Sequence, residues 1–251
     1  MDLQEAFYQK VKVLFKDYIN LITPSFEEQI KQAICVLHYK HLWGACKEAR
    51  FLLDKKQRLR EELFDAIMGI YSKRRNQHQS SFFLLQCFEN ALRSAMAISI
   101  SRALNHKKDN WFLRYDYPYT YITKKADKAI SQYNKKAKEP IDKYRCSTLD
   151  IFDLFTLGDL EEILDVYYPC FEWIFKEEKF YRGLVLPAFG TKEHAMKIIK
   201  RIRSARNEIF HNKPTHIKFK RDVEILLLCL GYNLKKASKI VNVRDFLNLK
   251  F

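Results

Sequence analysis

Apolar residues recur every three or four positions over most of the chain, a spacing that places them on one face of an α-helix. The first run covers Asp2 to Ile22, with an apolar face of Leu3, Phe7, Val11, Leu14, Tyr18 and Leu21. The Thr23-Pro24 pair ends this run, and Ser25 followed by Glu28 is a capping-box signal. The sequence therefore predicts a second helix from about Phe26 to His41.

Two more helices follow from the same pattern, a third through Leu53 and a fourth from Arg58 to Tyr71. The next residues, Tyr71 to Ser81, are polar and charged, which favours a linker or hinge. A long amphipathic helix is expected from Ser81 to about Leu104. The sequence thus predicts an N-terminal helical subdomain at 1–79 and a main helical bundle at 80–251.

The rest of the bundle alternates loops with helices. An aromatic-rich loop from Asn105 to Tyr121 either packs onto the bundle or stacks single-stranded bases. Gly and Pro mark a second loop from Gly183 to Gly190. Helices are expected at Ile122–Lys138, Tyr167–Tyr181, Thr191 to the Pro214 stop, Lys220–Leu230 and about Leu234–Leu249.

The composition supports an all-α class. Only six Gly and six Pro occur in 251 residues, too few for the regular turns of an all-β fold, and 47% apolar content suffices for a buried core. The six cysteines form no Cys-x-x-Cys pair and are expected to be reduced. No signal peptide and no membrane-spanning apolar run is present, so a cytoplasmic location without membrane contact is expected.

The formal net charge of +15 favours a polyanionic partner such as RNA. Ile122–Arg145 holds eight Lys/Arg against three Asp/Glu, and Lys192–Arg221 holds ten against two. These segments supply candidate RNA contacts at Lys124, Lys125, Lys135, Lys136, Lys200, Arg201, Arg203 and Lys213. His38 and His41 have helical spacing, but no nearby Cys or carboxylate completes a metal set, so neither metal nor cofactor is expected.

One short segment carries groups suited to phosphodiester chemistry: Arg206-Asn207-Glu208-Ile209-Phe210-His211. An arginine binds phosphate through its planar donor fork, and the histidine imidazole titrates near neutral pH. Asn207 and His211 are four residues apart, hence on one helical face, whereas Arg206 lies about 140° round the helix from His211. We expect Arg206, Asn207 and His211 to form a catalytic set.

The Arg-Asn-x-x-x-His pattern near a helix end resembles the signature of the HEPN superfamily. Two further segments resemble its Abi-like (abortive infection) branch: Phe82–Ser94, which contains Glu89-x-x-Leu92-Arg93, and Leu154–Leu164 around Gly158. Their order and spacing match as well, so the resemblance covers roughly 80–230. The chain departs from the pattern at Asn212, where Abi-like proteins often carry a second histidine, and at Lys213, where some HEPN toxins carry a tyrosine that a partner enzyme modifies.

The resemblance implies an all-α HEPN-type helical bundle with an additional N-terminal helical segment. It implies a metal-independent endoribonuclease of an abortive-infection or toxin–antitoxin system, cleaving RNA through attack of a ribose 2′-hydroxyl. Glu89 and Arg93 would then support the Arg206/His211 helix across the bundle. The same resemblance implies a homodimer with a composite site, and control by a protein or RNA antitoxin.

Two other functional classes stay open. A non-catalytic RNA-binding protein that holds a structured small RNA would use the same basic surface. A protein-interaction subunit of a defence system would bind RNA weakly and without preference. Substitution of Arg206 or His211 distinguishes the nuclease from both.

Overall fold

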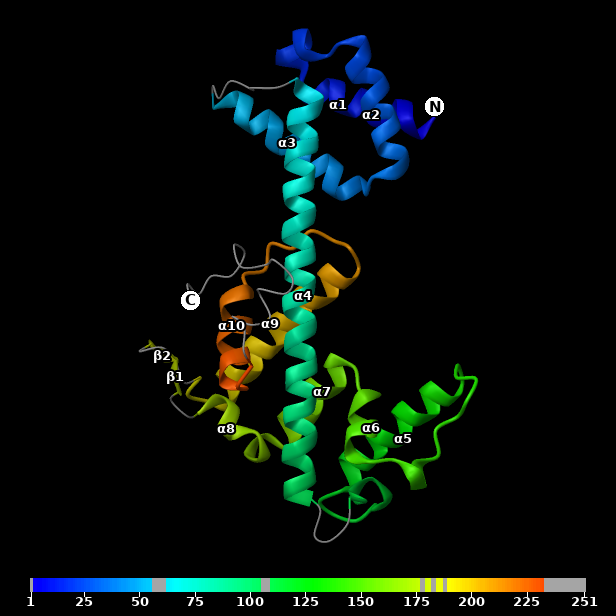
Figure 1. Ribbon diagram of the computed structural model, residues 1–251, viewed down its shortest axis with the longest axis vertical. Coiled ribbons are helices and arrows are strands. Elements are labelled where there is room, and N and C mark those ends of the chain that lie inside the picture. The colour runs from blue at the N-terminus through cyan, green and yellow to red at the C-terminus, as the bar shows by residue number, and fades with distance from the viewer. Residues whose placement is uncertain are drawn as a thin grey trace. The chain divides into compact units, whose positions relative to one another are not determined.

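A computed structural model describes residues 2–55, 62–104, 109–176, 179–181, 184–186 and 189–232 (Figure 1). These residues are mostly helical, which confirms the expected class. Contacts divide the chain into two compact units. The first comprises Met1–Ser81 with Ile209–Thr215, and the second Phe82–Glu208 with His216–Phe251.

The first unit is built from α1 (Leu3–Leu14), the 3₁₀ helix η1 (Lys16–Leu21), α2 (Pro24–Val36), α3 (Tyr39–Asp54) and the beginning of α4. The first predicted helix is therefore split at Phe15, where the backbone leaves the α-helical region, and Tyr18 adds a kink inside η1. The cap of α2 lies earlier than predicted: Thr23 accepts from the Phe26 amide at 3.1 Å, and Pro24 occupies the first turn, where its missing N–H costs nothing.

The predicted linker at Tyr71–Ser81 is wrong. Helix α4 runs without interruption from Leu63 to Leu104, so it contributes to both units. The segment contains neither Gly nor Pro, and its polar side chains find helical partners, as when Ser80 and Ser81 donate to carbonyls four residues earlier. A polar composition here indicates an exposed helix surface and not a break.

The second unit surrounds the C-terminal part of α4 with shorter elements. In chain order these are η2 (Trp111–Leu113), α5 (Thr120–Asn134), η3 (Lys143–Arg145), α6 (Thr148–Asp153), α7 (Leu157–Val166), η4 (Tyr168–Cys170), α8 (Glu172–Phe175), β1 (Lys179–Tyr181), β2 (Leu184–Leu186), α9 (Lys192–Phe210) and α10 (Lys220–Cys229). Its core includes Phe88, Leu92, Phe152, Phe155, Leu160, Ile199, Ile202 and Leu226.

Two predictions for this unit need correction. The helix expected at Tyr167–Tyr181 is replaced by η4, α8 and strand β1, the last of which pairs with β2 and so leaves the helical conformation. The loop expected at Gly183–Gly190 contains strand β2, which pairs antiparallel with β1. The last predicted helix, about Leu234–Leu249, lies outside the described residues.

The aromatic-rich segment before α5 divides by exposure. Trp111, Phe112 and Tyr119 are buried, and the Trp111 indole donates to Thr148 Oγ1 at 2.7 Å. Tyr115 and Tyr117 instead face solvent. Packing onto the bundle, one of the two roles predicted for this segment, therefore accounts for the three buried rings. It does not account for the exposed rings of Tyr115 and Tyr117.

Candidate functional site

Helix α9 carries Arg206 and Asn207 near its end. Thr191 caps it by accepting from the His194 amide at 3.2 Å, as expected for the residue that opens this helix. One face is buried through Ala195, Ile199, Ile202, Ala205 and Ile209. The opposite face exposes Lys197, Lys200, Arg201, Ser204 and Asn207, so a polar and basic stripe ends at the motif.

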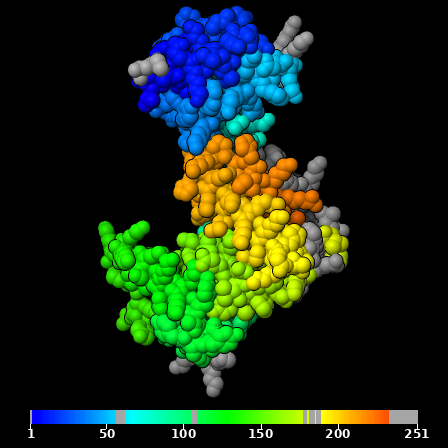
Figure 2. Space-filling view, turned by 180° about the vertical axis from the view of Figure 1, so that it is seen from behind, coloured from blue at the N-terminus to red at the C-terminus, as the bar shows by residue number. Residues whose placement is uncertain are grey.

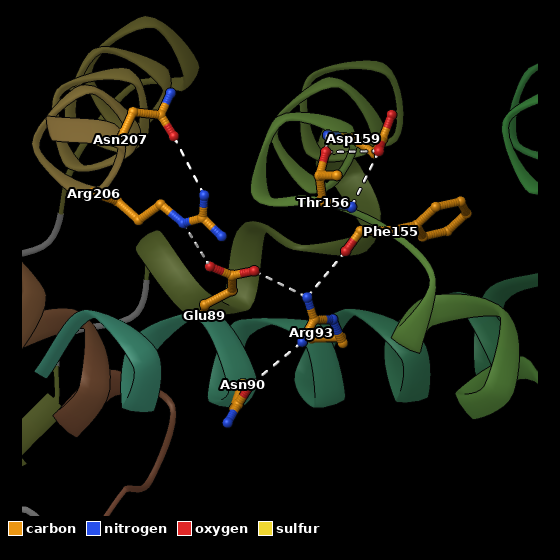
Figure 3. Close-up of polar contacts among 8 residues, drawn as sticks. All are labelled: Glu89, Asn90, Arg93, Phe155, Thr156, Asp159, Arg206 and Asn207. Atoms are coloured by element: carbon orange, nitrogen blue, oxygen red, sulfur yellow. Dashed lines mark hydrogen bonds and ion pairs between the residues drawn. The ribbon is translucent and has the colours of Figure 1, made fainter. Parts of the chain in front are cut away.

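The guanidinium of Arg206 is held by a carboxylate from α4. Its Nε donates to Glu89 Oε2 at 3.1 Å (Figure 3). The Glu89 side chain is only 10% exposed and that of Arg206 25% exposed, so solvent screens this ion pair weakly. The contact joins residues 117 positions apart and fixes the plane of the motif arginine.

A second arginine completes this arrangement. Arg93 Nη2 donates to Glu89 Oε1 at 3.0 Å and to the Phe155 carbonyl at 2.9 Å (Figure 3). Each oxygen of Glu89 therefore binds a different arginine. Removing Glu89 would leave the two largely buried guanidinium groups without the carboxylate that they share.

The Phe155 carbonyl was not singled out from the sequence. Thr156 Oγ1 accepts from the Asp159 amide at 3.2 Å, and Asp159 Oδ2 accepts from the Thr156 amide at 3.1 Å, which is a capping box at the start of α7. Burial raises the pKa of Asp159, but hydrogen bonds from Thr156 and the charge of Lys125 outweigh it and lower that pKa overall. The spacing Thr-x-x-Asp in the sequence signals this cap, which fixes the chain beside Phe155.

Asn207 lies on the exposed face of α9, and its Oδ1 is 3.4 Å from Arg206 Nη1. This is a long contact, so it orients the guanidinium only weakly. Figure 3 shows the side-chain oxygen of Asn207 directed toward the Arg206 guanidinium, and the residue is exposed. The exposed amide is therefore accessible to a ligand.

His211 directly follows α9 and is exposed. It belongs to Ile209–Thr215, the segment that packs with the first unit, whereas Arg206 and Asn207 belong to the second. Asn212 has a positive φ of 54°, and its Oδ1 accepts from Arg75 Nη1 at 2.8 Å. Asparagine tolerates this left-handed conformation better than most residues, so it suits the turn after the histidine.

The candidate RNA contacts differ in exposure. Lys124, Lys135, Lys136, Lys200, Arg201 and Lys213 are exposed. Lys125 is 15% exposed and forms ion pairs with Asp159 and Glu162. Arg203 Nε lies 2.6 Å from the buried Glu161, and Arg201 pairs with Asp222. Lys125 therefore joins α5 to α7 and is poorly placed for phosphate, whereas the Arg203 side chain is 42% exposed beside its ion pair.

Three histidines gather in the first unit, a grouping that the sequence did not predict in full. The ring of His41 lies 5.0 Å, centroid to centroid, from those of His38 and His78. Burial lowers the pKa of His41 to about 4, and nearby cationic groups, including Arg75 and Arg74, act in the same direction. Burial likewise lowers the pKa of His38 and of His78. These rings are therefore neutral near pH 7.

Within the described ranges, no group of three or more His, Cys, Asp or Glu side chains is arranged to hold a metal ion. All six cysteines are free thiols. Over the same ranges, no helix has the length and apolar character needed to cross a membrane. Comparisons with protein-family models, with curated proteins and with solved structures found no match.

Proposed function

We propose that the protein is a metal-independent endoribonuclease of a cellular defence system, with Arg206, Asn207 and His211 as its catalytic residues. The observation that carries this proposal is the ion pair between Arg206 and the buried Glu89. A surface arginine needs no such fixation, whereas an arginine that stabilises charge in a transition state gains from a fixed orientation. Arg93 and the Phe155 carbonyl extend the same support.

In the proposed reaction a ribose 2′-oxygen attacks the adjacent phosphorus while the bond to the 5′-oxygen breaks. The proton lost by the 2′-hydroxyl is balanced by one gained by the leaving 5′-oxygen. The products are a 2′,3′-cyclic phosphate and a 5′-hydroxyl. His211 transfers a proton in this reaction, which its solvent-exposed position allows.

Arg206 stabilises the charge that grows on the phosphoryl oxygens, a role in which one preorganised donor is typically worth about 3–4 kcal/mol. Asn207, exposed beside it, contacts the phosphate or the ribose. The exposed stripe of Lys197, Lys200 and Arg201 supplies positive charge along the same helix. RNA affinity should therefore depend strongly on salt.

One chain supplies one such motif, so we propose a two-fold homodimer that brings two Arg/His sets to one phosphate. The resemblance to HEPN ribonucleases supports this arrangement. A protein or RNA antitoxin that covers the basic stripe would inhibit the enzyme. The cytoplasm, where RNA substrates are abundant, is the proposed location.

The second candidate is a non-catalytic RNA-binding protein, favoured by the net charge of +15. Paired variants distinguish the two functions. The nuclease requires Arg206→Ala and His211→Ala to abolish the biological effect. The binding protein requires these variants to act like the wild type, while charge reversal at Lys124, Lys135 and Lys136 abolishes the effect.

A further inference from the structure

Several tyrosines of the second unit are more exposed than folding explains. Tyr117 is 92% exposed and Tyr144 is 82% exposed, while Tyr115 is 56% exposed. The rings of Tyr117 and Tyr144 bury little area, so they contribute little to the stability of the fold. Grouped exposed apolar surface instead indicates a site for a binding partner.

Contacts among their neighbours place two of these tyrosines together. The hydroxyl of Tyr115 donates to Asp127 on α5 at 2.9 Å, and Lys143 Nζ lies 3.1 Å from the same hydroxyl. Lys143 also pairs with Asp127. Tyr144 follows Lys143 directly in η3, and Tyr117 lies two residues from Tyr115, so the three exposed tyrosines come from neighbouring chain segments.

Backbone contacts hold this surface in a defined shape. The amide of Tyr144 donates to Asp142 Oδ1 at 3.0 Å, and Thr120 Oγ1 donates to the Tyr115 carbonyl at 2.8 Å. Asn134 bonds to both the amide and the carbonyl of Ile141, which ties the end of α5 to the loop before η3. The rings therefore project from a fixed backbone, which reduces the entropy lost on binding.

The charge around these rings is positive. Lys124 and Lys128 are exposed on α5 on either side of Asp127, and the Arg145 side chain is 88% exposed. The acidic residues here are paired with cations, Asp116 with Arg114, Asp127 with Lys143, and Asp142 with Arg145 at 3.5 Å. Figure 2 shows this part of the second unit, in green, projecting from its side.

We infer that Tyr115, Tyr117 and Tyr144, with Lys124, Lys128 and Arg145, form a docking surface for single-stranded RNA. Aromatic rings stack on unpaired bases, and lysines bind the phosphates between them. A duplex hides its base faces and would use only the cations. The inference rests on the proposed function for the choice of RNA, and it identifies where substrate is held outside the Arg206 site.

A chain of contacts within the second unit connects this surface to that site. Lys143 pairs with Asp127 on α5, and Lys125 on the same helix pairs with Asp159 on α7. Asp159 caps the turn that presents the Phe155 carbonyl to Arg93. RNA held by the tyrosines is thus bound to the same unit as Arg206.

The test measures binding of fluorescent 2′-O-methyl single-stranded RNA, which lacks the 2′-hydroxyl needed for cleavage, to the full-length protein. The double variant Tyr117→Ala/Tyr144→Ala should weaken binding at least tenfold, because stacking is worth about five- to one-hundred-fold per base. The double variant Tyr117→Phe/Tyr144→Phe keeps the rings and should bind within about twofold of the wild type. A blunt-ended duplex should bind all of these proteins equally.

Phe180→Ala is the matched control, since Phe180 is a 73% exposed ring of the same unit outside this surface. Equal affinity of the double alanine variant and the wild type, or an equal loss in Phe180→Ala, would overturn the inference. Single-stranded DNA of the same sequence shows whether binding requires the ribose backbone. If the double alanine variant loses affinity but the wild type cleaves no RNA, only the proposed function is contradicted. If cleavage depends on His211 but the double alanine variant binds like the wild type, only this inference is contradicted.

Discussion

Arg206 Nε donates to Glu89 Oε2 at 3.1 Å, so the motif helix α9 is joined to α4 through its arginine. The other oxygen of Glu89 accepts from Arg93 at 3.0 Å. A single buried carboxylate thus orients two guanidinium groups. This relationship connects the proposed chemistry with the stability of the second unit.

Glu89→Ala should lower the free energy of unfolding by about 3 kcal/mol, because it leaves two arginines without their buried anion. Urea denaturation followed by circular dichroism measures the change. Asn90→Ala is the control on the same helix: Asn90 is exposed and its 3.3 Å contact to Arg93 is long, so an effect below about 0.5 kcal/mol is expected. Equal stability of the two variants would show that Glu89 does not hold these arginines.

Substitutions in the two capping boxes distinguish the effect of a lost cap on stability from its effect on RNA cleavage. Thr156→Ala and Ser147→Ala each remove a capping side chain, and each should cost about 1 kcal/mol. Only Thr156 adjoins the Phe155 carbonyl that binds Arg93. RNA cleavage should therefore fall several-fold in Thr156→Ala and remain unchanged in Ser147→Ala. The same cleavage rate in both variants would show that the contact between Arg93 and the Phe155 carbonyl does not support cleavage.

The histidine group of the first unit predicts acid sensitivity. His41 has a pKa of about 4 in the folded protein against an ordinary value of 6.5, so the unfolded chain binds the proton first. Its contribution to stability is complete above about pH 6.5 and is lost as the pH falls toward 4, amounting to about 3 kcal/mol.

The variant His41→Phe keeps a ring of similar shape but cannot titrate. Unfolding measured from pH 7 to pH 4 should therefore show a smaller loss of stability in His41→Phe than in the wild type. Subtracting the stability curve of the variant from that of the wild type cancels the pH dependence of the carboxylates, which both proteins share. Parallel stability curves would mean that His41 is protonated equally well in the folded state.

The proposed homodimer predicts a mass near twice the 30.1 kDa of one chain in light scattering after size exclusion. Activity per chain should also fall when the protein is diluted below its dissociation constant, because each site needs both chains. A fully active monomer at micromolar concentration would exclude the composite site. Because activity would depend on dimerisation, the cleavage rates of Glu89→Ala and the wild type should be compared at equal protein concentration.

Much of this arrangement follows from local sequence patterns. The helical period, the Thr191 cap and the spacing of Glu89 and Arg93 on one helical face are visible in the sequence, because each depends on residues within one or two turns. The pairing of Glu89 with Arg206 was suggested by the resemblance and needs the tertiary fold to be seen.

Other features could not be predicted from the sequence, because they depend on packing between residues that are far apart along the chain. A polar run such as Tyr71–Ser81 lacks apolar periodicity whether it is a loop or an exposed helix, so its continuation of α4 depends on packing. The grouping of His78 with His38 and His41 joins residues about forty positions apart. The placement of His211 with the first unit likewise depends on contacts distant in sequence.

The most direct test incubates wild type, His211→Ala and Arg206→Ala with cellular RNA in EDTA and maps the product ends. We expect the wild type to cut RNA in the chelator and to leave 2′,3′-cyclic phosphate and 5′-hydroxyl ends. Arg206→Ala should be slower by at least about one-hundred-fold, and His211→Ala should be inactive or nearly so. Tight RNA retention without cleavage by the wild type, or equal cleavage by all three proteins, would contradict the proposed ribonuclease.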